Sequence, residues 1–250
     1  MRDFDWLVSK PIAHRGLFDP ALGVPENSLA AFRRAVERDI PIELDVQLTH
    51  DNTLAVVHDA TLERTTGIAL HVHQACRTDL GRLRLGDSGE PVPTLEQALE
   101  VTDGHVPVVI DVRRWSSESS PRLERAVAAG IRGYRGHVAL QSFDPVAVYR
   151  LRRLIGDSPV GQISGALRSA GRAAALIGRP MVTNFLTSPD FVSYELEMLP
   201  SRCTTFWRRR GMPILAWTVT SAKTEARAAR VADNFFFDEY LPTVHQMRTQ

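Results

Sequence analysis

The chain has 250 residues, of which 44% are hydrophobic and 24% are charged, the composition of an ordinary globular protein rather than a disordered or fibrous one. Thirty lysines and arginines stand against 29 aspartates and glutamates, so the formal net charge is +1. This balance excludes a general attraction to nucleic acid or to anionic membranes, and an anionic ligand would have to be bound by a local set of residues.

The N-terminal sequence and the cysteines bear on localisation. The sequence MRDFDWLVSK carries charges throughout and lacks the apolar core of a secretory signal. No stretch reaches the roughly 18 uncharged apolar residues of a membrane-spanning helix. Cys76 and Cys203 lie far apart and form no CxxC motif, so no disulfide framework is indicated. We therefore expect a cytoplasmic protein without stable membrane insertion, whose oligomeric state the sequence leaves unknown.

Eight short runs rich in β-branched and aromatic residues alternate with amphipathic stretches, which is the pattern of βα units around a parallel sheet. Eight is the strand number of the (β/α)8 TIM barrel, so we predict this α/β fold as one domain over residues 1–250. The predicted strands are 11–16, 41–48, 106–112, 137–143, 159–164, 180–186, 213–219 and 234–240.

The stretches between these runs predict helices with one apolar face. In the first of them, Leu29, Phe32 and Val36 share a face, and Ser28 or Asn27 can cap its start. One region breaks the alternation, because it is polar and rich in turn residues and begins with a predicted hairpin. We expect this region, approximately residues 51–89, to be a small insertion after the second barrel strand. The predicted helices are 28–39, 93–103, 121–131, 144–156, 166–178 and 221–232.

Acidic side chains share one face of the second and third predicted strands. Glu43 and Asp45 alternate with apolar residues, so both carboxylates point to the same side. Asp111 and Arg113 alternate with valine and isoleucine in the same way. Both pairs should face the barrel interior near the C-terminal strand ends, where TIM barrels have their active sites. We therefore expect three carboxylates and one guanidinium group to converge.

Such a group carries an excess of negative charge. Acidic side chains are almost never fully buried unless they are paired or bound to a cation. A divalent cation such as Mg²⁺ or Ca²⁺, which prefers carboxylate oxygens, would neutralise the excess. The alternative is a purely structural salt-bridge network among Glu43, Asp45, Arg15 and Arg113. Residue spacing alone leaves both interpretations open.

Two histidines are placed to reach the same end of the predicted barrel. His14 ends the first strand, and His58 ends the return strand of the hairpin. Hydrolysis of a phosphodiester needs a base for the nucleophile and an acid for the leaving alkoxide, and imidazoles titrate in the useful range. Arg15 and Arg113 could bind phosphate oxygens through paired hydrogen bonds. The pair of histidines fits this division between acid and base, although a single histidine at a strand end is usually a structural residue, so the pairing matters more than either one.

Four motifs in chain order resemble the opening signature of the glycerophosphodiester phosphodiesterase family: IAHRG, PENSLAAF, IELDVQLTHD and VVHDATLERTTG. Each motif alone is a weak signal, whereas the four in order are a strong one. The similarity continues through PVPTLEQAL, QSFDP and ILAWTV. It covers nearly the whole chain and is closest in residues 11–67.

The resemblance implies a (β/α)8 barrel with a small inserted subdomain. It also implies an enzyme of lipid and glycerol metabolism that uses a divalent cation, Mg²⁺ or Ca²⁺, to hydrolyse glycerophosphodiesters to sn-glycerol 3-phosphate and an alcohol. The implied roles are catalysis for His14 and His58, metal binding for Glu43, Asp45 and Asp111, phosphate binding for Arg15 and Arg113, and organisation of the first loop for Glu26 and Asn27.

The third strand departs from the family pattern. Where the family usually carries Glu-x-Lys, this chain has Asp111 and Arg113. Both departures keep the charge but change the reach, because Asp is one methylene shorter than Glu, and Arg is not an equivalent point charge to Lys. The choice of metal and the rate are the properties that these two positions would alter.

Two other functions are compatible with the same motifs. One is a related reaction on lysophospholipids, of the phospholipase D or phospholipase C type. The other is a phosphodiester-binding protein that has lost turnover, as the changes at Asp111 and Arg113 would allow. Trp115, Phe143 and Trp217 either line the substrate pocket or belong to the core. His71, His73 and Cys76 fit a solvated surface better than a zinc site, because no clear fourth ligand accompanies them.

Overall fold

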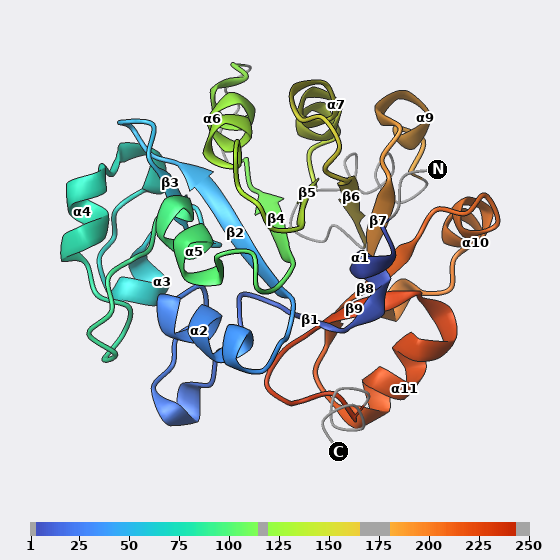
Figure 1. Ribbon diagram of the computed structural model, residues 1–250, viewed down its shortest axis with the longest axis horizontal. Helices are drawn as coiled ribbons and strands as arrows, with labels where there is room; N and C mark the ends of the chain where they lie inside the picture. Colours follow the sequence, from blue (N-terminus) through green and yellow to red (C-terminus); the bar gives the residue numbers. More distant parts are fainter. Residues whose placement is uncertain (1–3, 115–119, 166–180, 244–250) are drawn as a thin grey trace. The chain divides into compact units, whose positions relative to one another are not determined.

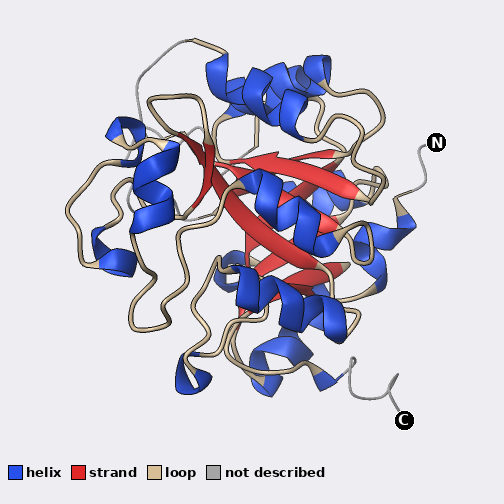
Figure 2. Ribbon diagram, turned by 60° about the vertical axis from the view of Figure 1, so that its left-hand side comes forward, coloured by secondary structure: helices blue, strands red, loops and turns tan. Residues whose placement is uncertain are grey.

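The computed structural model describes residues 4–114, 120–165 and 181–243. They divide into two compact units, one of Ala13–Val138 and the other of Met1–Ile12 with Ala139–Gln250. Strands and helices alternate along most of the chain (Figures 1 and 2). No helix among the described residues is both long and apolar enough to cross a membrane.

In the unit Ala13–Val138, one long strand lies between two parallel neighbours. Its register with them pairs Ala13 with Ile42 and Asp45 with Asp111. Because paired residues of parallel strands point to the same face, the Asp45 and Asp111 side chains stand side by side. A short antiparallel strand forms the predicted hairpin with the long strand. The strands are β1 (Ile12–Ala13), β2 (Ile42–Leu48), β3 (Leu54–Val56) and β4 (Val108–Val112).

The helices of this unit begin and end close to their predicted positions. The Oγ of Ser28 accepts a hydrogen bond from the backbone N–H of Ala31 at 3.1 Å and so caps the first of them, as predicted. The buried face of that helix includes Ala31, Phe32 and Ala35. The predicted helices found there are α2 (Leu29–Glu37), α5 (Leu95–Thr102) and α6 (Arg122–Gly130), and α2 contacts α5.

The chain between β3 and α5 contains only short elements and packs around an apolar cluster of its own. Such a satellite cluster is typical of a long connection that buries its own side chains. It supports our proposal that approximately residues 51–89 form an insertion after β2. The short elements are α3 (Glu63–Thr66), η2 (Val72–Gln74) and α4 (Arg77–Arg82), and the cluster includes Val57, Leu62, Val72, Leu80, Leu85 and Val92.

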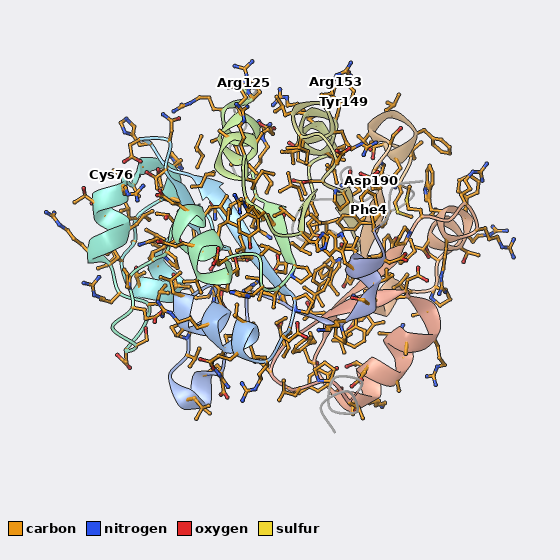
Figure 3. All side chains as sticks on the ribbon, viewed as in Figure 1. Phe4, Cys76, Arg125, Tyr149, Arg153 and Asp190 are labelled. Carbon is orange, nitrogen blue, oxygen red and sulfur yellow. The ribbon has the colours of Figure 1, made fainter. Side chains whose placement is uncertain are left out.

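In the other unit, five strands pair in parallel in chain order. They are β5 (Val138–Ser142), β6 (Val160–Ser164), β7 (Phe191–Glu195), β8 (Ile214–Val219) and β9 (Asn234–Phe237), with the helices α1 (Asp5–Ser9), α7 (Pro145–Leu154), α9 (Asn184–Thr187), α10 (Arg202–Arg208) and α11 (Ala222–Val231). Tyr149 and Arg153 stand one turn apart on the exposed side of α7, and the guanidinium carbon of Arg153 lies 4.7 Å from the Tyr149 ring centroid (Figure 3).

One predicted strand is wrong. Residues 180–186 were assigned to a strand because they combine β-branched and aromatic residues, but the structure has α9 there. Phe185 and Leu186 are 63% and 80% exposed, which a strand in the middle of a parallel sheet would not allow. The strand is instead β7, whose first four residues are buried. The helix predicted over residues 166–178 lies outside the described residues.

The predicted fold class is confirmed. Within the two units, eight strands run parallel to their neighbours and alternate with helices, as in a (β/α)8 TIM barrel. Among the described residues, β3 is the additional, antiparallel strand. The strands therefore present their C-terminal ends, where the candidate residues lie, in a common direction within each unit.

Gly161 on β6 permits a close approach of two strands. A Cβ atom added there would lie 2.3 Å from Cε2 of Phe191, a side chain that is fully buried. We expect Gly161→Ala to lower the free energy of unfolding by about 1–3 kcal/mol, because the ring has no room to move. Urea unfolding followed by circular dichroism measures this. Gly156→Ala is the control, since nothing lies within 4 Å of its added Cβ, and equal losses in both variants would contradict the argument.

Candidate functional site

Three carboxylates converge where β2 and β4 lie side by side. We call Glu43, Asp45 and Asp111 the acid cluster. One ligand atom from each lies within 4.8 Å of the others, and the three residues are 1–3% exposed. The spacing of two along β2 and the register with β4 produce this convergence, as the sequence predicted. Among the described residues, no other group of three His, Cys, Asp or Glu side chains converges in this way.

Two arginines neutralise part of the acid cluster. The Nη1 of Arg113 donates to Asp111 Oδ2 at 2.9 Å and to Asp45 Oδ1 at 3.2 Å. The Nε of Arg15 lies 3.5 Å from Asp45 Oδ2. Part of the salt-bridge network that was the structural alternative is thus present. Glu43 is bonded differently, since its Oε2 accepts from the backbone N–H of Arg15 at 3.0 Å.

The carboxylates of the acid cluster differ in their protonation. Burial, reinforced by the charge of Asp45, raises the pKa of Glu43 to about 8. Burial and the charge of Asp45 likewise raise the pKa of Asp111 to about 7, against the opposing charge of Arg113. Burial also acts to raise the pKa of Asp45, but the charges of Arg113 and Arg15 oppose it, and the pKa of Asp45 is lowered. Arg113 and Arg15 therefore stabilise the negative charge of Asp45. The charged forms of Glu43 and Asp111 are not stabilised to the same extent.

The acid cluster fits a hard divalent cation. Oδ1 of Asp111 is buried and accepts no hydrogen bond from any described residue, although a buried carboxylate oxygen normally has a partner. Three carboxylate oxygens at this separation are the ligand type that Mg²⁺ and Ca²⁺ prefer. Glu43, Asp45 and Asp111 are therefore the residues that would hold such an ion.

The loop after β1 brings His14, Arg15 and Asn27 to the acid cluster. Arg15 and Asn27 both have left-handed backbones, with φ of 56° and 51°, and the N–H of Asn27 donates to the Arg15 carbonyl at 2.9 Å. This conformation directs the Arg15 N–H at Glu43, and non-glycine residues adopt it uncommonly. The Nε2 of His14 lies 3.9 Å from Glu43 Oε2.

Glu26 and Asn27 connect that loop to charged side chains. The Nδ2 of Asn27 donates to Asp45 Oδ2 at 2.9 Å, and Asn27 Oδ1 accepts from the Asp45 N–H at 3.3 Å. The Nη1 of Arg15 donates to Glu26 Oε1 at 2.9 Å. These contacts agree with a loop-organising role for both residues.

His58 lies just beyond β3 and is held on two sides. Its Nδ1 is 2.6 Å from Oδ1 of Asp59. The Nε2 of Gln47 lies 2.8, 3.1 and 2.7 Å from the carbonyl oxygens of Val57, His58 and Asp59. Burial lowers the pKa of His58, and the charges of Arg113 and Arg15 act in the same direction against Asp45 and Asp59. The neutral imidazole is thereby favoured.

Three residues around His58 were not predicted from the sequence. Gln47 could have been found, because it continues the period-two face of Glu43 and Asp45 along β2. Asp59 adjoins His58 in the chain, but a neighbouring position does not show that the two side chains meet. Arg64 bonds to both Asp59 and Glu26, and nothing in its sequence spacing indicates this.

The aromatic residues proposed for the substrate pocket are Trp115, Phe143 and Trp217. Trp115 lies outside the described residues. Phe143 and Trp217 both belong to the other unit and contact each other edge to face, with ring centroids 5.8 Å apart. Their role as pocket residues stays a prediction.

Metal binding and protonation should compete at the acid cluster. The pKa values of Glu43 and Asp111, about 8 and about 7, lie above their ordinary values of 4.5 and 3.8. The folded metal-free protein therefore holds protons that the unfolded chain releases, and this stabilisation, present at acid pH, is lost as the pH rises through about 7 to 8. A cation that displaces those protons should stabilise the protein more at higher pH.

We accordingly expect Mg²⁺, Ca²⁺ or Mn²⁺ to raise the melting temperature more at about pH 8.5 than at about pH 6. Thermal unfolding with each metal and with a chelator at both pH values measures the difference. The control is Glu43→Gln, which removes one of the titrating carboxylates. It should weaken the pH dependence of the metal-induced rise in melting temperature. A metal-induced shift of equal size at both pH values would contradict competition with protons.

Comparison with known proteins places these residues within one family. Residues 14–239 match the profile of the Glycerophosphoryl diester phosphodiesterase family. The protein YhdW of Bacillus subtilis is 30% identical over 86% of this chain and 88% of its own length. The solved structure of a glycerophosphodiester phosphodiesterase from Parabacteroides distasonis is 25% identical, with a TM-score of 0.74 over 96% of this chain and 100% of that one.

A second solved structure supports the fold. It is a phosphodiesterase of Oleispira antarctica in complex with its product, sn-glycerol-3-phosphate. The TM-score is 0.76 at 19% identity, with 96% of this chain and 95% of that chain covered. At this identity the likeness shows the fold alone.

Proposed function

The chain belongs to the glycerophosphoryl diester phosphodiesterase family, and on this premise we propose that it hydrolyses glycerophosphodiesters to sn-glycerol 3-phosphate and an alcohol. The observation that carries the proposal is the acid cluster, which lies beside a histidine and an arginine from the loop after β1. The Oleispira antarctica enzyme binds the same product. The family match covers the whole region in which the candidate residues lie.

A divalent cation, Mg²⁺ or Ca²⁺, bound by Glu43, Asp45 and Asp111 would supply positive charge to a phosphate oxygen. Arg15 already lies at the acid cluster with its guanidinium group within reach of Asp45. The Arg15 guanidinium group could bind a second oxygen of a phosphodiester that enters there. Arg15, together with a cation held by the three carboxylates, would then fix the phosphate in one orientation.

His14 and His58 are the proposed acid and base. The neutral imidazole favoured at His58 can accept a proton at Nε2, because Asp59 accepts a hydrogen bond from Nδ1. His14 presents Nε2 toward Glu43 and supplies the second proton-transfer group. One histidine would activate the nucleophile and the other would protonate the leaving alkoxide.

Arg113 has a contact beyond the phosphate binding that the resemblance implies. Its Nη1 bonds to Asp45 and Asp111 rather than standing apart for phosphate. We propose that Arg113 holds the shorter Asp111 in the acid cluster, and that it binds phosphate when substrate and cation redistribute the charge. Hydrolysis is therefore compatible with both departures from the family pattern.

Product analysis tests the proposed reaction. The purified protein is incubated with glycerophosphocholine, glycerophosphoethanolamine and lysophosphatidylcholine in the presence of Mg²⁺, Ca²⁺ or Mn²⁺. We expect sn-glycerol 3-phosphate and the free alcohol from the first two. Turnover of lysophosphatidylcholine alone would replace the proposed substrate class with lysophospholipids. Binding of glycerophosphocholine without turnover under any metal would show a phosphodiester-binding protein.

A further inference from the structure

Arg64 joins two carboxylates that are far apart in the sequence. It lies on α3, and its side chain is 49% exposed. Its Nε donates to Asp59 Oδ2 at 2.5 Å, while Nη1 and Nη2 donate to Oε2 and Oε1 of Glu26 at 3.0 and 2.7 Å. All three guanidinium nitrogens thus donate hydrogen bonds. The ion pair with Glu26 is bidentate, a geometry that orients both side chains.

Each of these carboxylates has its second partner among the proposed catalytic and phosphate-binding residues. The other oxygen of Asp59 lies 2.6 Å from His58 Nδ1. Oε1 of Glu26 also accepts from Arg15 Nη1 at 2.9 Å. The chain of contacts therefore runs from His58 through Asp59, Arg64 and Glu26 to Arg15, and it joins the segment after β3 to the loop after β1.

The charges of the carboxylates decide which group donates in the contact between Asp59 and His58. Arg64 acts to lower the pKa values of Glu26 and Asp59, against the opposing effect of burial, and both pKa values are lowered. An ionised carboxylate can only accept hydrogen bonds, so Asp59 requires the proton of His58 to be on Nδ1. Nε2 is then the ring nitrogen that can accept a proton from the substrate, as in other carboxylate–histidine pairs.

We propose that Arg64 is a positioning residue for both ends of this chain. It fixes Asp59 so that the His58 ring keeps the Nδ1–H tautomer, and it fixes Glu26 so that Arg15 stays at the acid cluster. The proposal rests on the function proposed above, in which His58 transfers a proton and Arg15 binds phosphate. A surface salt bridge that only stabilised the fold would have neither effect.

The first test is kinetic. Arg64→Met should lower kcat by about 10- to 100-fold, as expected for loss of a group that orients a catalytic one. It should also raise KM, because Glu26 would no longer hold Arg15 in place for phosphate binding. Arg64→Lys keeps the positive charge but loses the paired N–H donors of the guanidinium group, and it should recover part of kcat. Arg77→Met is the matched control. Arg77 is the first residue of α4, and its Nη2 pairs at 2.8 Å with the exposed Glu96 of α5, so kcat of this variant should equal that of the wild type.

A double-mutant cycle distinguishes positioning from general stabilisation. If Arg64 acts on kcat through Asp59, adding Arg64→Met to Asp59→Ala should lower kcat by no more than about threefold further. Full multiplication of the two single effects on kcat would overturn the route through Asp59. Melting temperatures of all variants confirm that each is folded under the assay conditions.

A second measurement does not depend on turnover. Long-range ¹H–¹⁵N spectra in Mg²⁺ report which ring nitrogen carries the proton, and the His58 signals are assigned with His58→Gln. We expect the Nδ1–H tautomer in the wild type and in Arg77→Met, and a shift toward the tautomer mixture of an unrestrained imidazole in Arg64→Met. An unchanged His58 tautomer together with an unchanged kcat in Arg64→Met would overturn the inference. If no glycerophosphodiester is hydrolysed, the proposed function fails, while the spectra still decide whether Arg64 orients His58.

Discussion

Asp45→Asn is expected to lower kcat/KM for glycerophosphodiesters by about a thousandfold or more. Asp45 is the carboxylate of the acid cluster that stays ionised, and it is bonded to Asn27, Arg15 and Arg113. The neutral amide removes a charged metal ligand from the centre of these contacts. Because charge stabilisation by a metal is several kcal/mol and each 1.36 kcal/mol is tenfold in rate, a loss of this size follows.

Steady-state kinetics and metal titration of the same preparation measure the two consequences together. Asp45→Asn should bind Mg²⁺, Ca²⁺ or Mn²⁺ at least about tenfold more weakly. Asp87→Asn is the control, since it removes the same charge from an exposed position and should leave both properties unchanged. A variant at Asp45 with wild-type kcat/KM would show that the acid cluster is a structural network, which was the alternative that residue spacing left open.

His14→Ala and His58→Ala are expected to lower kcat by about 100- to 10,000-fold each, the range contributed by a positioned general acid or base. Neither histidine belongs to the acid cluster, so both variants should keep the metal-induced rise in melting temperature. Loss of turnover with retained metal binding would show that the histidines act in proton transfer and not in metal binding. Kinetics and thermal unfolding with and without metal measure it.

His73→Ala is the matched control for these variants, because His73 is exposed on the η2 turn and its ring lies 5.2 Å from that of His71. It should retain wild-type kcat. Wild-type kcat in both His14→Ala and His58→Ala would remove the two-histidine mechanism. Loss of turnover together with loss of the metal response would mean instead that the histidines support the acid cluster.

The site could be predicted from the sequence where local periodicity decides the geometry. The alternation along β2 places Glu43 and Asp45 on one face whatever the neighbouring strands are, and the same holds for Asp111 on β4. The register that sets Asp45 beside Asp111 follows once β2 and β4 pair in parallel. These positions needed only the strand assignment, which was correct for both strands.

Contacts that depend on tertiary structure were beyond the sequence. The bonds of Arg64 to Glu26 span 38 residues, and long flexible side chains do not show their partners in a spacing pattern. The engagement of Arg113 with Asp45 belonged to the salt-bridge alternative, and the sequence could not decide between that contact and phosphate binding, because a guanidinium group next to carboxylates is compatible with both. The error at residues 180–186 arose since composition favoured a strand, whereas burial, which decides the matter, is a property of the folded chain.

Chelation followed by addition of metal tests the central claim most directly. The wild-type protein is stripped of metal, its metal content is measured, and release of sn-glycerol 3-phosphate from glycerophosphocholine is followed before and after Mg²⁺, Ca²⁺ or Mn²⁺ is restored. We predict that the stripped protein releases no product and that at least one of these ions restores release. Undiminished release by protein that contains no metal would contradict the role assigned to Glu43, Asp45 and Asp111.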